Sequence, residues 1–104
     1  MTNPNERRDA IRVKVDVPAR YRAGGSAEKP GRIDNISRGG LLLVADEAIP
    51  EGTRLRIAFD DTQGRRHEVV GEVVRSAPMG RTGVSFVQIE DATLDYVRVV
   101  LGVP

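Results

Sequence analysis

The sequence contains no cysteine in its 104 residues. This absence excludes a disulfide framework, a thiolate metal site and a cysteine nucleophile. No apolar run approaches the roughly 18 residues that a membrane-spanning helix needs, because charges or glycines interrupt each run. The first residues are polar where a secretory signal would carry an apolar stretch. We therefore expect a soluble protein of the cytoplasm that does not insert into a membrane.

Histidine is nearly absent as well. His67 is the one histidine, and it stands between Arg66 and Glu68 in a strand-like stretch. Metal sites and catalytic triads need several convergent groups, so we expect His67 at the surface and neither a metal ion nor a cofactor. The acidic residues cluster in turns and near a helix start, where solvent exposure and capping explain them. Enzymatic activity is not expected.

The charge is unevenly distributed along the chain. Residues 1–38 hold nine Lys or Arg and five Asp or Glu, whereas residues 39–104 hold seven and ten. The first part therefore carries a net charge of +4 and the second part −3, which together give the net charge of +1. A basic first third favours an anionic partner, and a solvated surface accounts for it equally well.

Alternating apolar and polar residues predict six short strands. From Ile11 to Tyr21 every second residue is apolar, which is typical of a strand with one buried face. Pro18 cannot donate a ladder hydrogen bond, so we expect an edge or a bulge there. The other strands are expected over residues 31–36, 41–45, 53–59, 65–75 and 82–88.

A helix is predicted after the last strand, where apolar residues recur at helical spacing: Leu94, Val97 and Leu101. Asp91 or Thr93 is the expected cap at its start, and Gly102 is expected to end it. Gly71 lies inside a long strand and predicts a bend or a close backbone approach. These features favour a mainly β fold, a barrel with the helix across an open end. We expect one domain over residues 11–104, preceded by a flexible arm over residues 1–10.

The stretch RDAIR is a first candidate for ligand contact. It places Arg8 and Arg12 four residues apart before and at the entry to the first strand. Each guanidinium is a planar fork of donors that suits phosphate oxygens or the O6 and N7 edge of guanine. A solvated or loosely nucleic-acid-binding terminus is the plainer interpretation of such a cluster.

The stretch NISRGG is a second candidate. Asn35 and Ser37 are two residues apart, so on an extended backbone both side chains point to one side. Gly39 and Gly40 allow positive φ angles and allow a ligand to approach the backbone closely. Ordinary turn chemistry also explains these residues.

Taken together, the two stretches resemble the signature of the PilZ domain family, bacterial receptors for the second messenger cyclic di-GMP. That signature is RxxxR, followed after one strand by (D/N)xSxxG. The resemblance extends from about Arg7 to the C-terminal helix. It implies a six-stranded antiparallel β-barrel with a short C-terminal α-helix, in agreement with the alternation pattern.

The resemblance implies ligand-binding roles for the arginines. Arg8 and Arg12 match the arginines that bind the phosphates of cyclic di-GMP and the edges and faces of its guanines. Arg7 stands directly before RxxxR, and family members with such an arginine hold two stacked ligand molecules. We therefore add Arg7 to the expected site.

The second motif contributes the other expected site residues. Asn35, Ser37 and Gly40 match the corner that contacts a guanine and shapes the turn. Arg38 and Gly39 fill variable positions of the motif and are expected neighbours of the ligand.

The function implied by the resemblance is that of an adaptor. Cyclic di-GMP would order the N-terminal arm across the barrel and create a surface for an effector protein. Two alternatives stay open: a PilZ-like adaptor that acts through protein contacts without ligand, and a small barrel that binds RNA or single-stranded DNA. Aromatic residues make up only 4% of the chain, which leaves few rings for base stacking.

Overall fold

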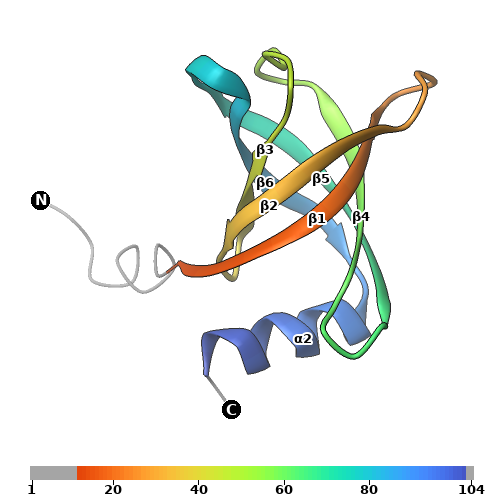
Figure 1. Ribbon diagram of the computed structural model, residues 1–104, viewed down its shortest axis with the longest axis vertical. Coiled ribbons are helices and arrows are strands. Elements are labelled where there is room, and N and C mark those ends of the chain that lie inside the picture. Colours follow the sequence, from red (N-terminus) through yellow and green to blue (C-terminus); the bar gives the residue numbers. More distant parts are fainter. Residues whose placement is uncertain (1–11, 103–104) are drawn as a thin grey trace, which may run out of the picture.

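The computed structural model describes residues 12–102. They form a closed barrel in the order β1-β2-β3-β6-β5-β4, with each neighbouring pair antiparallel. Figure 1 shows the barrel with one helix beneath it. The elements are β1 (Val13–Ala23), β2 (Lys29–Ile36), β3 (Gly40–Val44), β4 (Arg54–Asp60), β5 (Arg66–Ser76), the 3-10 turn η1 (Pro78–Gly80), β6 (Arg81–Ile89) and α2 (Asp91–Leu101). The predicted fold class is confirmed.

The core fills the inside of the barrel with alternate side chains of the strands. In β4, Leu55, Ile57 and Phe59 are at most 1% exposed, as their alternation with arginines predicts. The other buried apolar residues come from all six strands, the β3–β4 connection and the helix: Ala19, Tyr21, Ile33, Ile36, Leu41, Leu43, Ala45, Ile49, Ala58, Val69, Val73, Val84 and Val97. Burial of these side chains is the main favourable contribution to folding.

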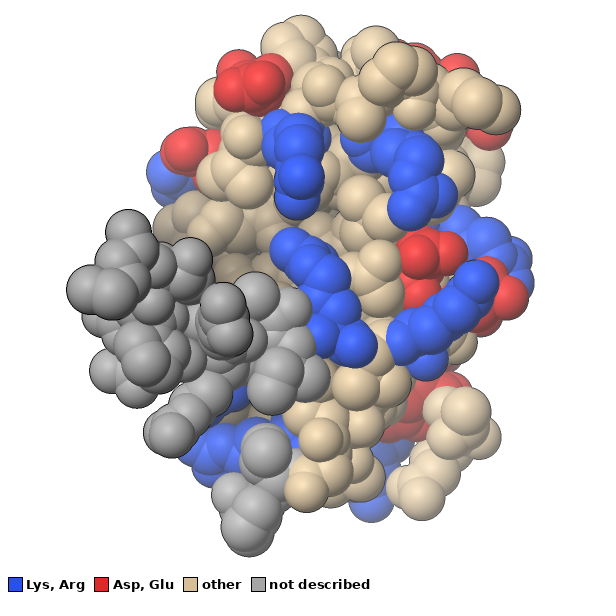
Figure 2. Space-filling model, turned by 90° about the vertical axis from the view of Figure 1, so that its left-hand side faces the viewer, with Lys and Arg blue, Asp and Glu red and all other residues tan. Residues whose placement is uncertain are grey.

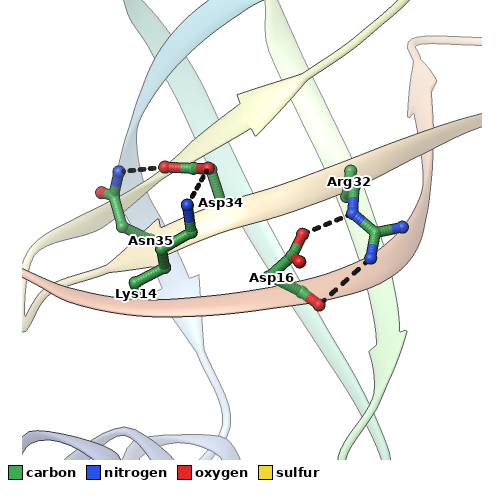
Figure 3. A network of polar contacts seen from close by, with 5 residues as sticks. All are labelled: Lys14, Asp16, Arg32, Asp34 and Asn35. Atoms are coloured by element: carbon green, nitrogen blue, oxygen red, sulfur yellow. Dashed lines mark hydrogen bonds and ion pairs between the residues drawn. The ribbon is translucent and has the colours of Figure 1, made fainter.

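The first strand bends at a bulge before Pro18. The register between β1 and β2 shifts between Lys14 and Val17, and Asp16 has a φ of 51°. Aspartate tolerates this left-handed backbone better than most residues. The Arg32 guanidinium donates to the Asp16 carboxylate and to the Asp16 backbone carbonyl oxygen (Figure 3). This contact with Arg32 also lowers the pKa of Asp16. Pro18 pairs with β2, while pairing with β4 begins only at Ala19, so the strand has an edge at Pro18, which was one of the two expected alternatives.

Gly71 allows β5 and β6 to pack closely. A Cβ atom at this position would collide with the Val84 side chain, and the strand register shifts between Val70 and Gly71. The predicted close approach is therefore confirmed. Gly71 is one of the positions at which the sheet curls toward closure.

The helix α2 covers one end of the barrel (Figure 1). Val97 is fully buried, and Tyr96, Val100 and Leu101 pack against the core. Gly102 ends the helix with a φ of 73°, as expected, and its N–H donates to the Val99 carbonyl. In residues 12–102 no helix is long and apolar enough to cross a membrane.

The expected cap of α2 is wrong. The N-cap residue is Glu90, and no side chain caps the helix there. Asp91 begins the helix, and Thr93 lies inside it with its side chain buried. Thr93 is the third residue of the helix and so lies past the N-cap position, and its hydroxyl hydrogen-bonds His67.

His67 is buried, which contradicts the expected surface position. Its side chain is 4% exposed, and its ring lies 5.2 Å from the Phe59 ring and 4.8 Å from the Tyr96 ring. Nε2 is 2.8 Å from an Asp61 carboxylate oxygen, and Nδ1 is 3.0 Å from the Thr93 hydroxyl. A carboxylate only accepts, so Nε2–H donates to Asp61, and the hydroxyl can donate to Nδ1 of a neutral ring. His67 therefore joins the β4–β5 loop, β5 and α2.

The contact with His67 lowers the pKa of Asp61, with further lowering from the Arg65 and Gln63 backbone N–H groups. A carboxylate whose pKa is lower in the folded state stabilises the fold above its ordinary pKa, and this stability is lost as the pH falls through the lowered value. We expect Asp61→Asn to lose less stability than the wild type as the pH falls from about 5 through the lowered pKa of Asp61.

Urea unfolding at a series of pH values measures this difference. Asp60→Asn is the matched control, because Asp60 is the exposed neighbour at the end of β4. An Asp61→Asn variant with the same pH dependence as the wild type would contradict the assigned contact.

Candidate ligand-binding site

The corner between β2 and β3 contains the NISRGG motif. The Ser37 N–H donates to the Gly40 carbonyl at 2.8 Å, and the Ser37 hydroxyl donates to the same oxygen at 3.2 Å. The Ser37 side chain is 3% exposed. Asn35 lies in β2 and lines an outer pocket, so the two side chains do not share one accessible side as expected. The register between β2 and β3 shifts at a bulge between Ile33 and Asn35. Ser37 shapes the turn.

The two glycines of the corner do not have the positive φ angles that the sequence suggested. A Cβ atom on Gly40 would instead collide with the Val84 carbonyl, because β3 and β6 approach closely there. The Phe86 N–H donates to the Gly39 carbonyl at 2.8 Å, which also links the corner to β6. A Cβ atom on Gly39 would meet no atom within 4 Å. Only Gly40 is required by packing.

Gly40→Ala is expected to destabilise the fold by about 1–3 kcal/mol, because the added methyl group forces two paired strands apart. Gly39→Ala, at the neighbouring open position, is expected to change the free energy of unfolding by less than about 0.5 kcal/mol. Chemical denaturation of both variants measures the difference. Equal stability of the two variants would contradict the close approach at Gly40.

The structure brings the described parts of the two motifs together. An Arg12 guanidinium N–H donates to the Asn35 side-chain oxygen at 2.9 Å. The Asn35 amide nitrogen donates to Asp34 at 3.0 Å, and Lys14 lies 3.8 Å from the other Asp34 oxygen (Figure 3). Asp34 thus orients the amide so that its oxygen faces Arg12. Arg7 and Arg8 lie outside the described residues, as do the expected arm over residues 1–10 and the start of the expected first strand, Ile11.

A pocket of about 260 Å³ lies beside this contact on the outside of the barrel. It is lined by Arg12, Asn35, Leu42, Arg75, Ala77, Arg81 and Gly83. Three of these residues are arginines and none is acidic. Figure 2 shows Lys and Arg side chains gathered on the side of the barrel that is on the left in Figure 1. The pocket therefore suits an anion. Arg38 is exposed at the corner and does not line the pocket.

Arg75 and Arg81 belong to neither motif, and the sequence analysis missed them. They reach the pocket through strand register, because Asn35 pairs with Leu42, Leu42 with Gly83, and Gly83 with Arg75. Arg81 is two residues before Gly83 on β6, so its side chain lies on the face of the strand that Gly83 occupies. The sequence placed Arg75 at the end of one predicted strand and Arg81 just before the next, and this was the signal that could have pointed to them. The barrel order was needed to place them opposite Asn35.

Two other pockets have different chemistry. A groove of about 650 Å³ beside α2 is lined by residues of mixed charge, including Asp61, Arg65 and Asp95. A pocket of about 170 Å³ at another part of the surface contains the Tyr21 hydroxyl, which donates to Glu47 at 2.9 Å. Burial raises the pKa of Tyr21 to about 12, with a further contribution from this hydrogen bond. Within residues 12–102, neither pocket brings together three arginines that lack an ion-pair partner, as the arginine-lined pocket does.

The four aromatic rings of the chain serve the core. Tyr21 and Phe59 are buried, and Phe86 and Tyr96 are partly buried and pack against the core. No ring is presented on the outer face as a stacking platform for successive bases. The nucleic-acid-binding alternative therefore has no support in the positions of these rings.

Comparisons with known proteins agree with the architecture. The model of the PilZ domain family matches residues 6–101. A comparison with curated protein sequences gives no significant match. The structure is similar to the PilZ domain of CeSA from a cellulose-synthesizing bacterium, with 18% identity and a TM-score of 0.67, over 89% of this chain and 97% of that chain.

Two longer proteins are also similar. The Bacillus subtilis inhibitor of motility MotI/DgrA gives a TM-score of 0.70 at 17% identity, over 88% of this chain and 47% of that chain. The Borreliella burgdorferi PlzA protein, whose structure is a complex with c-di-GMP, gives a TM-score of 0.68 at 15% identity, over 97% of this chain and 38% of that chain. The chain thus spans less than half of each. At these identities the similarity shows the fold alone.

Proposed function

Because the chain belongs to the PilZ domain family, we propose that it is a receptor for cyclic di-GMP that binds its ligand beside the NISRGG corner. The observation that carries this proposal is the contact between Arg12 and Asn35 at the edge of an arginine-lined pocket. This contact joins one residue from each motif. The described residues that line the pocket include three arginines and no acidic residue.

The ligand chemistry fits these groups. Cyclic di-GMP carries two phosphates and two guanines, so it combines negative charge with flat surfaces and the O6 and N7 acceptors. The guanidinium groups of Arg8 and Arg12 supply charge-assisted hydrogen bonds to the phosphates and contacts to the guanines. Arg7 adds a third guanidinium to this group and accommodates a second, stacked ligand molecule.

The corner supplies the other side of the site. Asn35 offers an amide that Asp34 already orients, and Gly39 leaves open space above the backbone. Ser37 and Gly40 hold the shape of the turn, which fixes the distance between Asn35 and the neighbouring strand β3. Arg38 is exposed next to them and contacts the ligand from the rim.

We further propose that the protein acts as an adaptor in the cytoplasm, where the messenger is produced. Ligand contacts to Arg7 and Arg8 would order residues 1–10 against the barrel and create a surface that an effector protein recognises. Hydrogen exchange of the amides in residues 1–10 tests this step. Slower exchange on addition of cyclic di-GMP is expected, and unchanged exchange at saturating ligand would contradict it.

The receptor proposal predicts saturable binding of cyclic di-GMP by the full chain in a calorimetric titration, at two ligands per chain. Arg8→Ala combined with Arg12→Ala is expected to weaken binding by roughly a hundredfold or more, because both substitutions remove charge-assisted hydrogen bonds. GTP is the competitor that tests selectivity for the cyclic dinucleotide.

Arg65→Ala combined with Arg66→Ala is the matched control, since it removes the same charge from the start of β5 and the residue before it, beside α2. It is expected to bind as the wild type does. A folded wild type that fails to bind would contradict the receptor proposal and favour the adaptor that acts without ligand. Saturation at one ligand per chain would contradict only the stacked pair.

A further inference from the structure

The far wall of the arginine-lined pocket is built from residues outside both motifs. Arg75 lies near the end of β5, and Arg81 begins β6 after the turn η1. Both side chains are exposed, so they are held there by the strands on which they lie and not by burial.

These arginines differ from many of the other basic residues of the barrel in their ion pairing. Within residues 12–102, neither Arg75 nor Arg81 lies within ion-pair distance of a carboxylate, and the same is true of Arg12. Eight of the other basic residues in residues 12–102 have acidic partners: Lys14 with Asp34, Arg20 with Glu28, Lys29 with Glu47, Arg32 with Asp16, Arg54 with Glu72, Arg56 with Glu68, Arg66 with Glu68 and Arg98 with Asp95. Arg22, Arg38 and Arg65 have none in this part of the chain, but they do not line the pocket. Among the described residues, the three arginines around the pocket thus have no ion-pair partner.

The floor between the two walls is small and apolar. Leu42 and Gly83 lie there as a cross-strand pair. A Cβ atom on Gly83 would come within 3.3 Å of the Arg75 Cβ and 3.7 Å of its Nε. The Arg75 side chain therefore passes over Gly83, whose lack of a side chain leaves room for it.

Three guanidinium groups around one pocket repel one another and raise the positive potential inside it. An anion relieves this repulsion, and a phosphate matches the guanidinium donors better than any neutral group. A flat, partly apolar ligand surface can lie on Leu42, beside the Arg75 side chain that covers Gly83. The pocket thus has the groups that are needed to bind a phosphate attached to a planar group.

We propose that Arg75 and Arg81 bind a phosphate of the cyclic dinucleotide from the side opposite Arg12, so that the site has a second cationic wall outside the two motifs. This inference rests on the proposed function. According to this proposal, β5 and β6 contribute directly to affinity, in addition to the motif residues at the start of β1, on β2 and at the corner.

Calorimetric titration of cyclic di-GMP into the full chain tests the second wall. Arg75→Ala combined with Arg81→Ala is expected to raise the Kd by at least roughly tenfold relative to the wild type. Arg75→Lys combined with Arg81→Lys keeps the charge and is expected to recover most of the affinity, because a phosphate also accepts from an ammonium group. Arg65→Ala combined with Arg66→Ala again serves as the control and is expected to bind like the wild type. Thermal unfolding verifies that each variant is folded.

The outcomes separate this inference from the receptor proposal. A wild type that does not bind overturns both. Binding by the wild type together with an unchanged Kd for the double alanine variant overturns the second wall and leaves the receptor proposal standing. A double lysine variant as weak as the double alanine variant shows that the contact depends on the planar guanidinium and not on its charge, and it overturns the phosphate contact as proposed.

Discussion

The close approach of β3 and β6 at Gly40 is the constraint on which the outer face of this barrel depends. Gly40 has no side chain to hold the Val84 carbonyl away, so the two strands pair from the first residue of β3. That pairing places Leu42 beside Gly83 and sets the register of the neighbouring strands. Asn35 on one side and Arg75 on the other therefore face the same small floor. The arginine-lined pocket, where we propose that the ligand binds, is a consequence of how the barrel closes.

The end of the barrel that α2 covers has a different requirement, which is that its buried polar groups need hydrogen-bond partners. The helix α2 closes the barrel there, and its buried face carries Thr93 as well as apolar residues. Burial of a polar group is costly unless the group is hydrogen-bonded. His67 satisfies Thr93 and Asp61 together, and no buried side-chain polar atom of the described residues is left without a partner. This cluster fixes the helix, whereas the arginine-lined pocket leaves its charges available to a ligand.

Sequence patterns predicted the strands and the inward residues of β4 because each depends on local alternation. The same alternation places His67 inward with Val69 and Val73, but its polar side chain favoured a surface position until its partners were known. Those partners include Thr93, which is 26 residues away. The resemblance implied that Arg12 and Asn35 serve one ligand, and the structure places their side chains in contact. Arg75 and Arg81 were missed because their place depends on barrel order, which no local pattern contains.

The central claim is that cyclic di-GMP occupies the outer face between Asn35 and Arg75. A titration followed by backbone amide NMR of the full chain tests this claim most directly, because it reports position as well as binding. The account predicts that the largest shift changes fall on the corner Asn35–Gly40, on Leu42 and Gly83, and around Arg75 and Arg81, with little change in α2. Shift changes concentrated beside α2 or around Tyr21 and Glu47, or no changes at all, would contradict it.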